Sequence, residues 1–141
     1  MTLSHYEISG LLYRYARAVD TKDWDLYRSV FTEDAHIDYS SAGIPAGPRD
    51  SVAEFLSQGF AAIPMSMHYI TNIEILEAEG DAARVRAMFY NPMQLPGVNG
   101  LSYCGGYYHH EVVRTADGWK SRRLTEDNVW FINRPGSPAG G

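Results

Sequence analysis

The chain has 141 residues, with 12 lysines and arginines against 17 aspartates and glutamates, a formal net charge of −5. This length suits one domain, and a mildly acidic chain without a basic block is poorly suited to bind a nucleic-acid backbone. The one cysteine, Cys104, excludes an intramolecular disulfide and a multi-cysteine zinc site. No apolar run approaches the roughly 18 residues of a membrane span, and the first residues do not resemble a secretory signal. We therefore expect a cytoplasmic protein that binds neither nucleic acid nor membranes.

Aromatic residues make up 13% of the chain, and ten of them are tyrosines. A buried tyrosine ring contributes apolar surface, while its hydroxyl needs a hydrogen-bond partner. The composition fits an apolar cavity with a polar end and fits equally well an aromatic-rich core with tyrosines near its surface.

The N-terminal half predicts three helices. The first opens with a capping box, Ser4-His5-Tyr6-Glu7, and its apolar residues recur every three or four positions until a helix end near Asp20. Asp23 can cap a second helix that ends at Glu33-Asp34, and a third begins near Asp50.

Strands dominate the rest of the chain. A short alternating strand is expected over residues 35–39, and four longer ones over residues 65–78, 83–93, 101–115 and 119–131. Three helices followed by an antiparallel run predict an α+β domain, with the helices packed on one face of a curved, mostly antiparallel sheet. We expect this single domain to span residues 1–132 and the glycine- and proline-rich tail, residues 133–141, to be flexible.

Asp20 is the first candidate for chemistry. It lies at the C-terminal end of a predicted helix, where the helix dipole disfavours a carboxylate. It either meets a donor from elsewhere in the fold or caps the following turn, and the local sequence leaves both open. Tyr15 precedes it by five residues, about 140° around the helix, so both side chains can approach one cavity from adjacent angles.

Histidines in two predicted strands are the other candidates. Alternation places His68, Ile70 and Asn72 on one face of the first long strand. A strand histidine of this kind is either a packed core residue or a catalyst. His109 and His110 point to opposite faces and cannot form a metal pair, while Tyr108 and His110 share a face with Val112 that we expect to be the inner one.

Familiar nucleophile, phosphate-binding and zinc motifs are absent: the chain contains no GxSxG, P-loop, GxGxxG or HExxH pattern. Neither a cofactor nor a metal is expected.

Three segments resemble the SnoaL-like branch of the NTF2-like superfamily: LLYRYARAVDTKDWDLYRSVFTEDA, MHYITN and GGYYHHEVVRTADGWK. This branch includes polyketide cyclases, scytalone dehydratase, bile-acid 7α-dehydratase and the lindane dehydrochlorinase type. The resemblance covers roughly residues 4 to 131 with the segments in the family's order. It implies a cone-shaped α+β barrel with a deep apolar pocket.

The resemblance also implies a site. Dehydratase and dehydrochlorinase members pair an aspartate at the end of the first helix with a histidine on the strand after the third helix, and Asp20 and His68 fall on these positions. Tyr15 stands where bile-acid dehydratase-like members carry a tyrosine and the dehydrochlorinase a lysine. His110 replaces an aspartate common among relatives, and Leu124 replaces an arginine of the dehydrochlorinase. Without that lysine and arginine, halide elimination is disfavoured.

These observations predict a cofactor-independent lyase, a dehydratase acting on a small apolar hydroxy-ketone, polyketide or steroid-like substrate. The predicted catalytic residues are Asp20, His68 and Tyr15, and the predicted substrate-binding residues are His110, Tyr108 and Asn72. A ketosteroid-type isomerase or a polyketide cyclase could use the same base. A protein that binds a hydrophobic ligand without turnover is the other alternative.

We also expect a homo-oligomer, a trimer ahead of a dimer. Relatives with the aspartate–histidine pair tend to be trimers, and a sheet covered by helices on one face leaves the other exposed. The expected contact stripe on that face consists of Met67, Tyr69, Thr71, Ile73 and Ile75.

Overall fold

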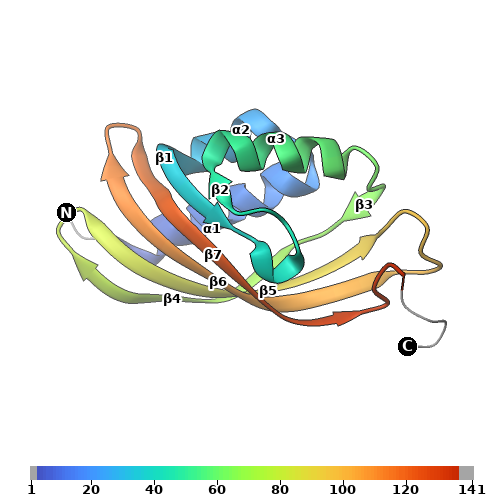
Figure 1. Cartoon of the computed structure of the whole chain (residues 1–141). Helices are drawn as coiled ribbons and strands as arrows, with labels where there is room; N and C mark the ends of the chain where they lie inside the picture. Colours follow the sequence, from blue (N-terminus) through green and yellow to red (C-terminus); the bar gives the residue numbers. More distant parts are fainter. Residues whose placement is uncertain (1–2, 137–141) are drawn as a thin grey trace.

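Three helices lie across one face of a strongly curved, seven-stranded sheet in the computed structural model, which describes residues 3–136 (Figure 1). The helices are α1 (His5–Asp20), α2 (Trp24–Val30) and α3 (Arg49–Phe60). The strands are β1 (Phe31–Asp38), β2 (Gly47–Pro48), β3 (Met65–Ser66), β4 (Tyr69–Glu79), β5 (Ala82–Gln94), β6 (Ser102–Thr115) and β7 (Gly118–Ile132). A short 3-10 turn, η1 (Ser40–Ala42), follows β1. The predicted α+β class, with helices on one face of a curved sheet, is confirmed.

The predicted helix starts are confirmed by their caps. The backbone N–H of Glu7 donates to Ser4 Oγ at 3.1 Å, and the N–H of Ser4 donates to Glu7 Oε1 at 3.2 Å, which completes the capping box of α1. The N–H of Leu26 donates to Asp23 Oδ1 at 3.1 Å and caps α2.

No helix within residues 3–136 is long and apolar enough to cross a membrane.

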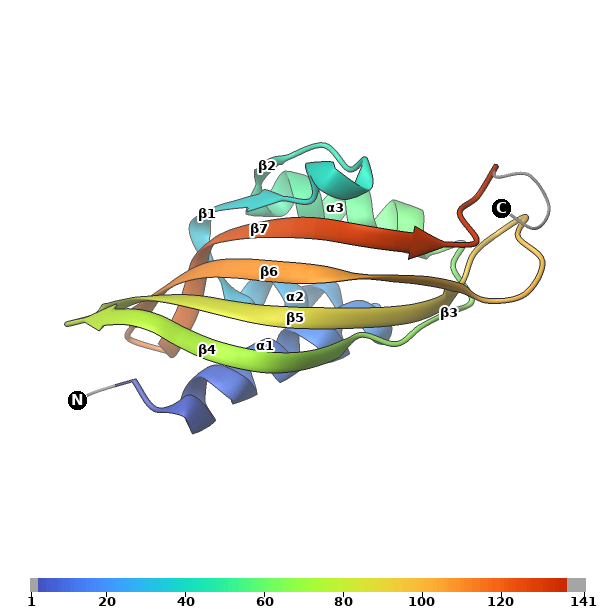
Figure 2. The ribbon, with the colours of Figure 1, turned by 90° about the horizontal axis from the view of Figure 1, so that it is seen from below.

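The sheet is mixed rather than purely antiparallel. Its order is β2-β1-β7-β6-β5, and β3 and β4 both pair with β5 (Figure 2). β1 runs parallel to β7, with Ile37 opposite Leu124, while every other pair is antiparallel. Phe31 and the acidic residues after it belong to β1, not to the end of the second helix, because Phe31 is fully buried against β7.

The strand predicted over residues 65–78 is interrupted at three points, the last of them between Ile75 and Glu77. The chain leaves the ladder between Ser66 and Tyr69, and a bulge follows at Asn72, whose φ is +51°. A bulge adds one residue to one strand and so exchanges the faces to which later side chains point. The prediction that Asn72 shares the face of His68 is therefore wrong: Asn72 is exposed.

The same bulge divides the predicted contact stripe. Met67 and Tyr69, which precede it, are about half exposed. Ile73 and Ile75, which follow it, pack against the hydrophobic core instead. The prediction of one continuous stripe is wrong for these two residues.

The glycine pair in β6 allows two close approaches from β7. A Cβ on Gly105 would lie 2.5 Å from the indole ring of Trp130, and a Cβ on Gly106 would lie 1.9 Å from the carbonyl oxygen of Asp127. The pairing of β6 with β7 shifts register between these glycines. The glycines thus let β7 pack closely at an irregular point of the sheet.

Gly106→Ala is expected to lower the free energy of unfolding by at least about 2 kcal/mol, because the new Cβ meets backbone that cannot rotate away. Urea denaturation measures the effect. Gly59→Ala in α3 is the matched control: its Cβ meets nothing within 4 Å, and alanine in a helix should stabilise by roughly 0.5–1 kcal/mol. Equal stability of Gly106→Ala and wild type would contradict the close approach.

Candidate active site

A cavity of about 370 Å³ lies between the helices and the concave face of the sheet. Most of its wall is aromatic or aliphatic, as in typical small-molecule sites, and a few polar groups point into it. Its polar and tyrosine lining includes Tyr15, Tyr39, His68, Asn91, Tyr108 and Glu126.

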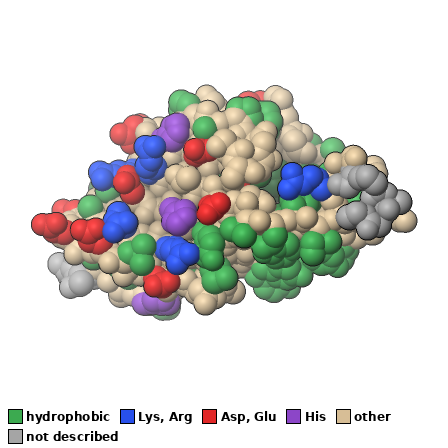
Figure 3. All heavy atoms as spheres, turned by 60° about the horizontal axis from the view of Figure 1, so that its bottom comes forward, with side chains coloured by type: hydrophobic (Ala, Val, Ile, Leu, Met, Phe, Trp, Pro, Cys, Tyr) green, Lys and Arg blue, Asp and Glu red, His purple; other side chains and the backbone are tan. Residues whose placement is uncertain are grey.

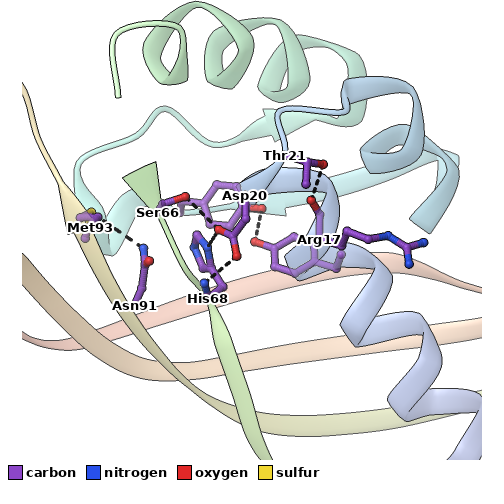
Figure 4. Close-up of polar contacts among 9 residues, drawn as sticks. Arg17, Asp20, Thr21, Ser66, His68, Asn91 and Met93 are labelled. Carbon is purple, nitrogen blue, oxygen red and sulfur yellow. Dashed lines mark hydrogen bonds and ion pairs between the residues drawn. The ribbon is translucent and has the colours of Figure 1, made fainter. Parts of the chain in front are cut away.

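The carboxylate of Asp20 accepts hydrogen bonds from three donors, one on Ser66 at the end of β3 and two on His68 between β3 and β4 (Figure 4). His68 Nδ1 lies 2.6 Å from Asp20 Oδ1, Ser66 Oγ donates to the same oxygen at 2.8 Å, and the backbone N–H of His68 donates to Oδ2 at 2.7 Å. These bonds offset the unfavourable position of a carboxylate at a helix C-terminus. The structure therefore brings together two predicted residues that lie 48 positions apart.

This contact fixes the tautomer of the neutral imidazole. The carboxylate only accepts, so in that form Nδ1 carries the hydrogen and Nε2 is left with a free lone pair. The side chain of His68 is 7% exposed and lines the cavity, while that of Asp20 is 21% exposed and does not line it. Nε2 is thus the nitrogen available to a molecule in the cavity.

Three tyrosine hydroxyls form a chain beside this pair. Tyr39 OH lies 2.7 Å from Tyr15 OH and 2.8 Å from Tyr27 OH. Burial raises the pKa of all three phenols above its usual value, so the hydroxyls stay protonated. Tyr15 and Tyr39 line the cavity and can direct an O–H bond at a ligand oxygen.

Tyr39 is a site residue that the sequence reading missed. The signal was present, because Ala35, Ile37 and Tyr39 alternate along the β1 segment and all three are buried. The face that these three residues share points inward and reaches the cavity at Tyr39.

The predicted substrate-binding residues Tyr108 and His110 lie at different depths. Both are buried on the inner face of β6 together with Val112, as predicted. Tyr108 lines the cavity, but His110 does not. The ring of His110 packs edge-on against Tyr15, with centroids 6.3 Å apart, so it supports the cavity wall from behind.

His110 is a neutral imidazole. Its Nδ1 lies 2.8 Å from Ser121 Oγ, and its Nε2 has no hydrogen-bond partner within the described part of the chain. Burial lowers the pKa of His110 to about 3. It cannot donate a proton from a charged form near neutral pH.

Asn91 occupies the place that Asn72 does not reach. It is the polar residue in a run of inward-facing side chains on β5, it lines the cavity, and it is 5% exposed. Its Oδ1 has no hydrogen-bond partner among residues 3–136. A buried orphan acceptor facing a cavity is suited to bind a ligand donor, and alternation along β5 could have revealed it.

Glu126 of β7 is the second missed polar residue. Its carboxyl lines the cavity and is partly buried. Burial, together with the negative charges of Asp127 and Asp38, raises the pKa of Glu126 to about 7, against a weaker lowering effect of the Ser41 hydroxyl. The sequence carried no signal for it, because Glu126 lies in a charged stretch typical of a solvated strand.

The raised pKa of Glu126 makes stability depend on pH. A carboxyl whose pKa is higher in the folded than in the unfolded state stabilises the fold at a pH below its ordinary pKa, near 4.5. This stabilisation is lost as the pH rises through the folded-state pKa of about 7. Between about pH 5 and about pH 8, the free energy of unfolding of Glu126→Gln should therefore rise by on the order of 2 kcal/mol relative to that of wild type. Urea denaturation at both pH values measures this change.

Glu79→Gln, at the exposed end of β4, controls for the loss of one negative charge. The raised pKa would be contradicted if the free energies of unfolding of wild type and Glu126→Gln differed by the same amount at both pH values.

Within residues 3–136, no group of three or more histidine, cysteine, aspartate or glutamate side chains is arranged to hold a metal ion.

Comparison with known proteins places this fold and site in a family. The family model of the SnoaL-like domain matches residues 1–125. Rv2910c, an uncharacterized protein of Mycobacterium tuberculosis, is 36% identical over 121 residues, 85% of this chain and 82% of its own length. The chain belongs to the SnoaL-like family, as the resemblance of its segments implied.

Solved structures share the fold. A proposed aromatic ring hydroxylase from Novosphingobium aromaticivorans is 34% identical, with a TM-score of 0.84 over 92% of both chains. A proposed scytalone dehydratase from the same organism is 20% identical, with a TM-score of 0.82 over 96% of this chain and 93% of its own. The latter shows likeness of fold alone.

Proposed function

We propose that this protein is a cofactor-independent lyase that dehydrates a small, largely apolar hydroxy-ketone, with His68 as its base. The 2.6 Å contact between His68 Nδ1 and Asp20 Oδ1 carries the proposal, because it leaves Nε2 as a proton acceptor at the wall of an apolar cavity. The resemblance of the segments around Asp20 and His68 to dehydratase members of the SnoaL-like family supports this class of reaction.

The reaction proceeds in two steps. His68 Nε2 removes a proton from the carbon next to the substrate carbonyl, and the electron pair moves to the carbonyl oxygen to form an enolate. The enolate then re-forms the carbonyl and a carbon–carbon double bond as the β-hydroxyl leaves. That hydroxyl takes the proton held by His68 and departs as water, so the base returns to its starting state.

Tyr15 and Tyr39 stabilise the enolate. Their hydroxyls lie 2.7 Å apart at the cavity wall, so one of them donates to the other, and the second keeps its hydrogen for the oxygen on which negative charge develops. The raised pKa of Tyr15 makes its phenol a poor outright proton donor. A hydrogen-bonding role is therefore the better assignment for Tyr15.

Proton abstraction is the step shared with isomerases and cyclases, and it can be tested before the natural substrate is known. Wild-type protein should catalyse deuterium exchange at the carbon next to the carbonyl of 1-tetralone in D₂O, followed by NMR. His68→Ala should abolish this exchange. Asp20→Asn should slow it by about 10²- to 10⁴-fold because the imidazole adopts the wrong tautomer, and the double variant should be scarcely slower than His68→Ala.

Controls come from the same elements. His109→Ala changes the exposed neighbour of His110 on β6 and should leave exchange unchanged. Tyr15→Phe should slow exchange by about 10- to 10³-fold, whereas Tyr13→Phe, on the exposed side of α1, should not. Binding of ketones without any exchange would favour a ligand-binding protein, and exchange that survives His68→Ala would remove His68 as the base.

We further propose that the protein is a homo-oligomer, a trimer ahead of a dimer, assembled through the outer face of the sheet. An aromatic cluster of Tyr69, Tyr90, Tyr103 and Trp130 crosses β4 to β7 there, with Tyr90 stacked on both Tyr103 and Trp130. Apolar side chains gather on one half of this side of the molecule, whereas charged ones gather on the other (Figure 3). Exposed patches of this kind commonly mark interfaces.

Sedimentation at micromolar concentration should show a trimer. Trp130→Glu should shift the protein to the monomer, because a charge would be buried at the centre of the contact. Glu111→Gln, at the charged half of β6, is the control and should leave the assembly intact. A wild-type monomer would refute the proposed assembly.

A further inference from the structure

Glu126 and His68 lie on opposite sides of the cavity. β4, β5, β6 and β7 lie side by side in this order, with His68 immediately before β4 and Glu126 on β7 (Figure 2). Glu126 is paired with Tyr108, two positions beyond the glycine pair in the inward-facing row of β6. A ligand that meets Nε2 of His68 at one end can therefore extend toward the carboxyl of Glu126.

The surroundings of Glu126 offer little to neutralise a negative charge. No ion pair involves this carboxyl within residues 3–136, and its one side-chain hydrogen bond there is a 3.5 Å contact from Ser41 Oγ. The Ser41 hydroxyl has a single hydrogen and lies closer, at 2.9 Å, to the backbone oxygen of Glu126. The hydroxyl lowers the pKa of the carboxyl, but burial outweighs this effect.

The ionisable groups around the carboxyl are mostly neutral or negative. Tyr15 from α1 and Tyr108 and Cys104 from β6 are neutral, because burial raises the pKa of each, that of Cys104 to about 11. Asp38 at the end of β1 and Asp127 on β7 are negative and oppose ionisation of Glu126.

Arg134 is the basic residue of the cavity lining, and its guanidinium lies over the ring of Phe131, 4.9 Å from the centroid. It makes no ion pair with Glu126 in the described structure.

We propose that Glu126 is a specificity-determining residue whose protonated carboxyl donates a hydrogen bond to an uncharged oxygen at the far end of the substrate, and that the cavity excludes carboxylate substrates. The substrate class is then a neutral molecule with two separated oxygens, a carbonyl near His68 and an ether, carbonyl or hydroxyl near Glu126. This inference rests on the proposed function only for the end of the substrate that faces His68.

Proton linkage supports this assignment. A carboxyl with a pKa of about 7 is largely protonated in mildly acidic solution and can donate there. Above that pH it becomes an unpaired charge in an apolar cavity, which repels a ligand acceptor and is costly to desolvate further. Binding of a neutral acceptor should therefore weaken as the pH rises.

The test uses 6-methoxy-1-tetralone, a neutral probe with two separated oxygens and no titratable group, and calorimetric binding at about pH 6 and about pH 8. For wild type, Kd should rise about tenfold between these values, the change expected for one group titrating midway. Glu126→Gln should bind at both pH values with the affinity of wild type at the lower one, because the amide remains a neutral donor. The carboxylate 5,6,7,8-tetrahydro-2-naphthoate should bind Glu126→Gln more tightly than wild type at pH 8.

Arg134→Gln is the control variant: it should keep the wild-type pH dependence of binding, which shows that Arg134 does not set the charge of Glu126. Deuterium exchange by the wild-type protein is measured in parallel. Exchange without pH-dependent binding would refute the role of Glu126 alone, whereas pH-dependent binding without exchange would refute only the catalytic proposal.

Three outcomes would overturn the inference. The first is a wild-type affinity that is the same at both pH values or undetectable at both. The second is binding of the probe that Glu126→Gln abolishes although its circular dichroism is unchanged, since the amide would then fail as a donor. The third is tighter binding of 2-aminotetralin than of the ketone at pH 8, lost in Glu126→Gln, which would make Glu126 a site for a cationic group.

Discussion

The position of the candidate site depends on the Asp20 carboxylate, which ties the end of α1 to the sheet. One of its oxygens accepts from the His68 backbone N–H, a donor that a regular strand would direct toward its neighbour. This accounts for the gap in the ladder between β3 and β4, while the N–H of Met67 still donates to the carbonyl of Pro92 on β5. A single side chain at the end of α1 thus interrupts the strand and orients the imidazole.

Burial gives the cavity its chemical character. Phenols, a thiol and one carboxyl line an apolar wall in which ionised forms are disfavoured, so these groups act as neutral hydrogen-bond donors. Asp20 lies outside the lining and is neutralised locally by its three donors. The proposed function therefore calls for an uncharged ligand, and His68 lines the cavity that would hold it.

Local sequence signals predicted the elements but only part of the site. The capping box at Ser4 and the cap at Asp23 can each be recognised from four consecutive residues, and the structure contains both. The parallel pairing of β1 with β7 joins segments more than eighty residues apart, and the bulge at Asn72 leaves no trace in a strand pattern that continues through it. The Asp20–His68 pairing came from the family resemblance, because each residue alone fitted a structural role equally well. Asn91 was accessible to the alternation argument, whereas Glu126 acquires its character only from neighbours on other strands.

The bulge at Asn72 also divides β4 into two parts with different surroundings. Before it, the chain carries His68 to the cavity and leaves Met67 and Tyr69 on the outer face. After it, Ile73 and Ile75 face the core, and the carbonyl of Ile73 lies 3.2 Å from Nε2 of His5 at the start of α1. α1 is therefore bound to β4 near its start, by His5, and to Ser66 and His68 at its end, by Asp20. The helix is thus held at two points, with Tyr15 between them at the cavity wall, where it belongs to both the core and the cavity lining.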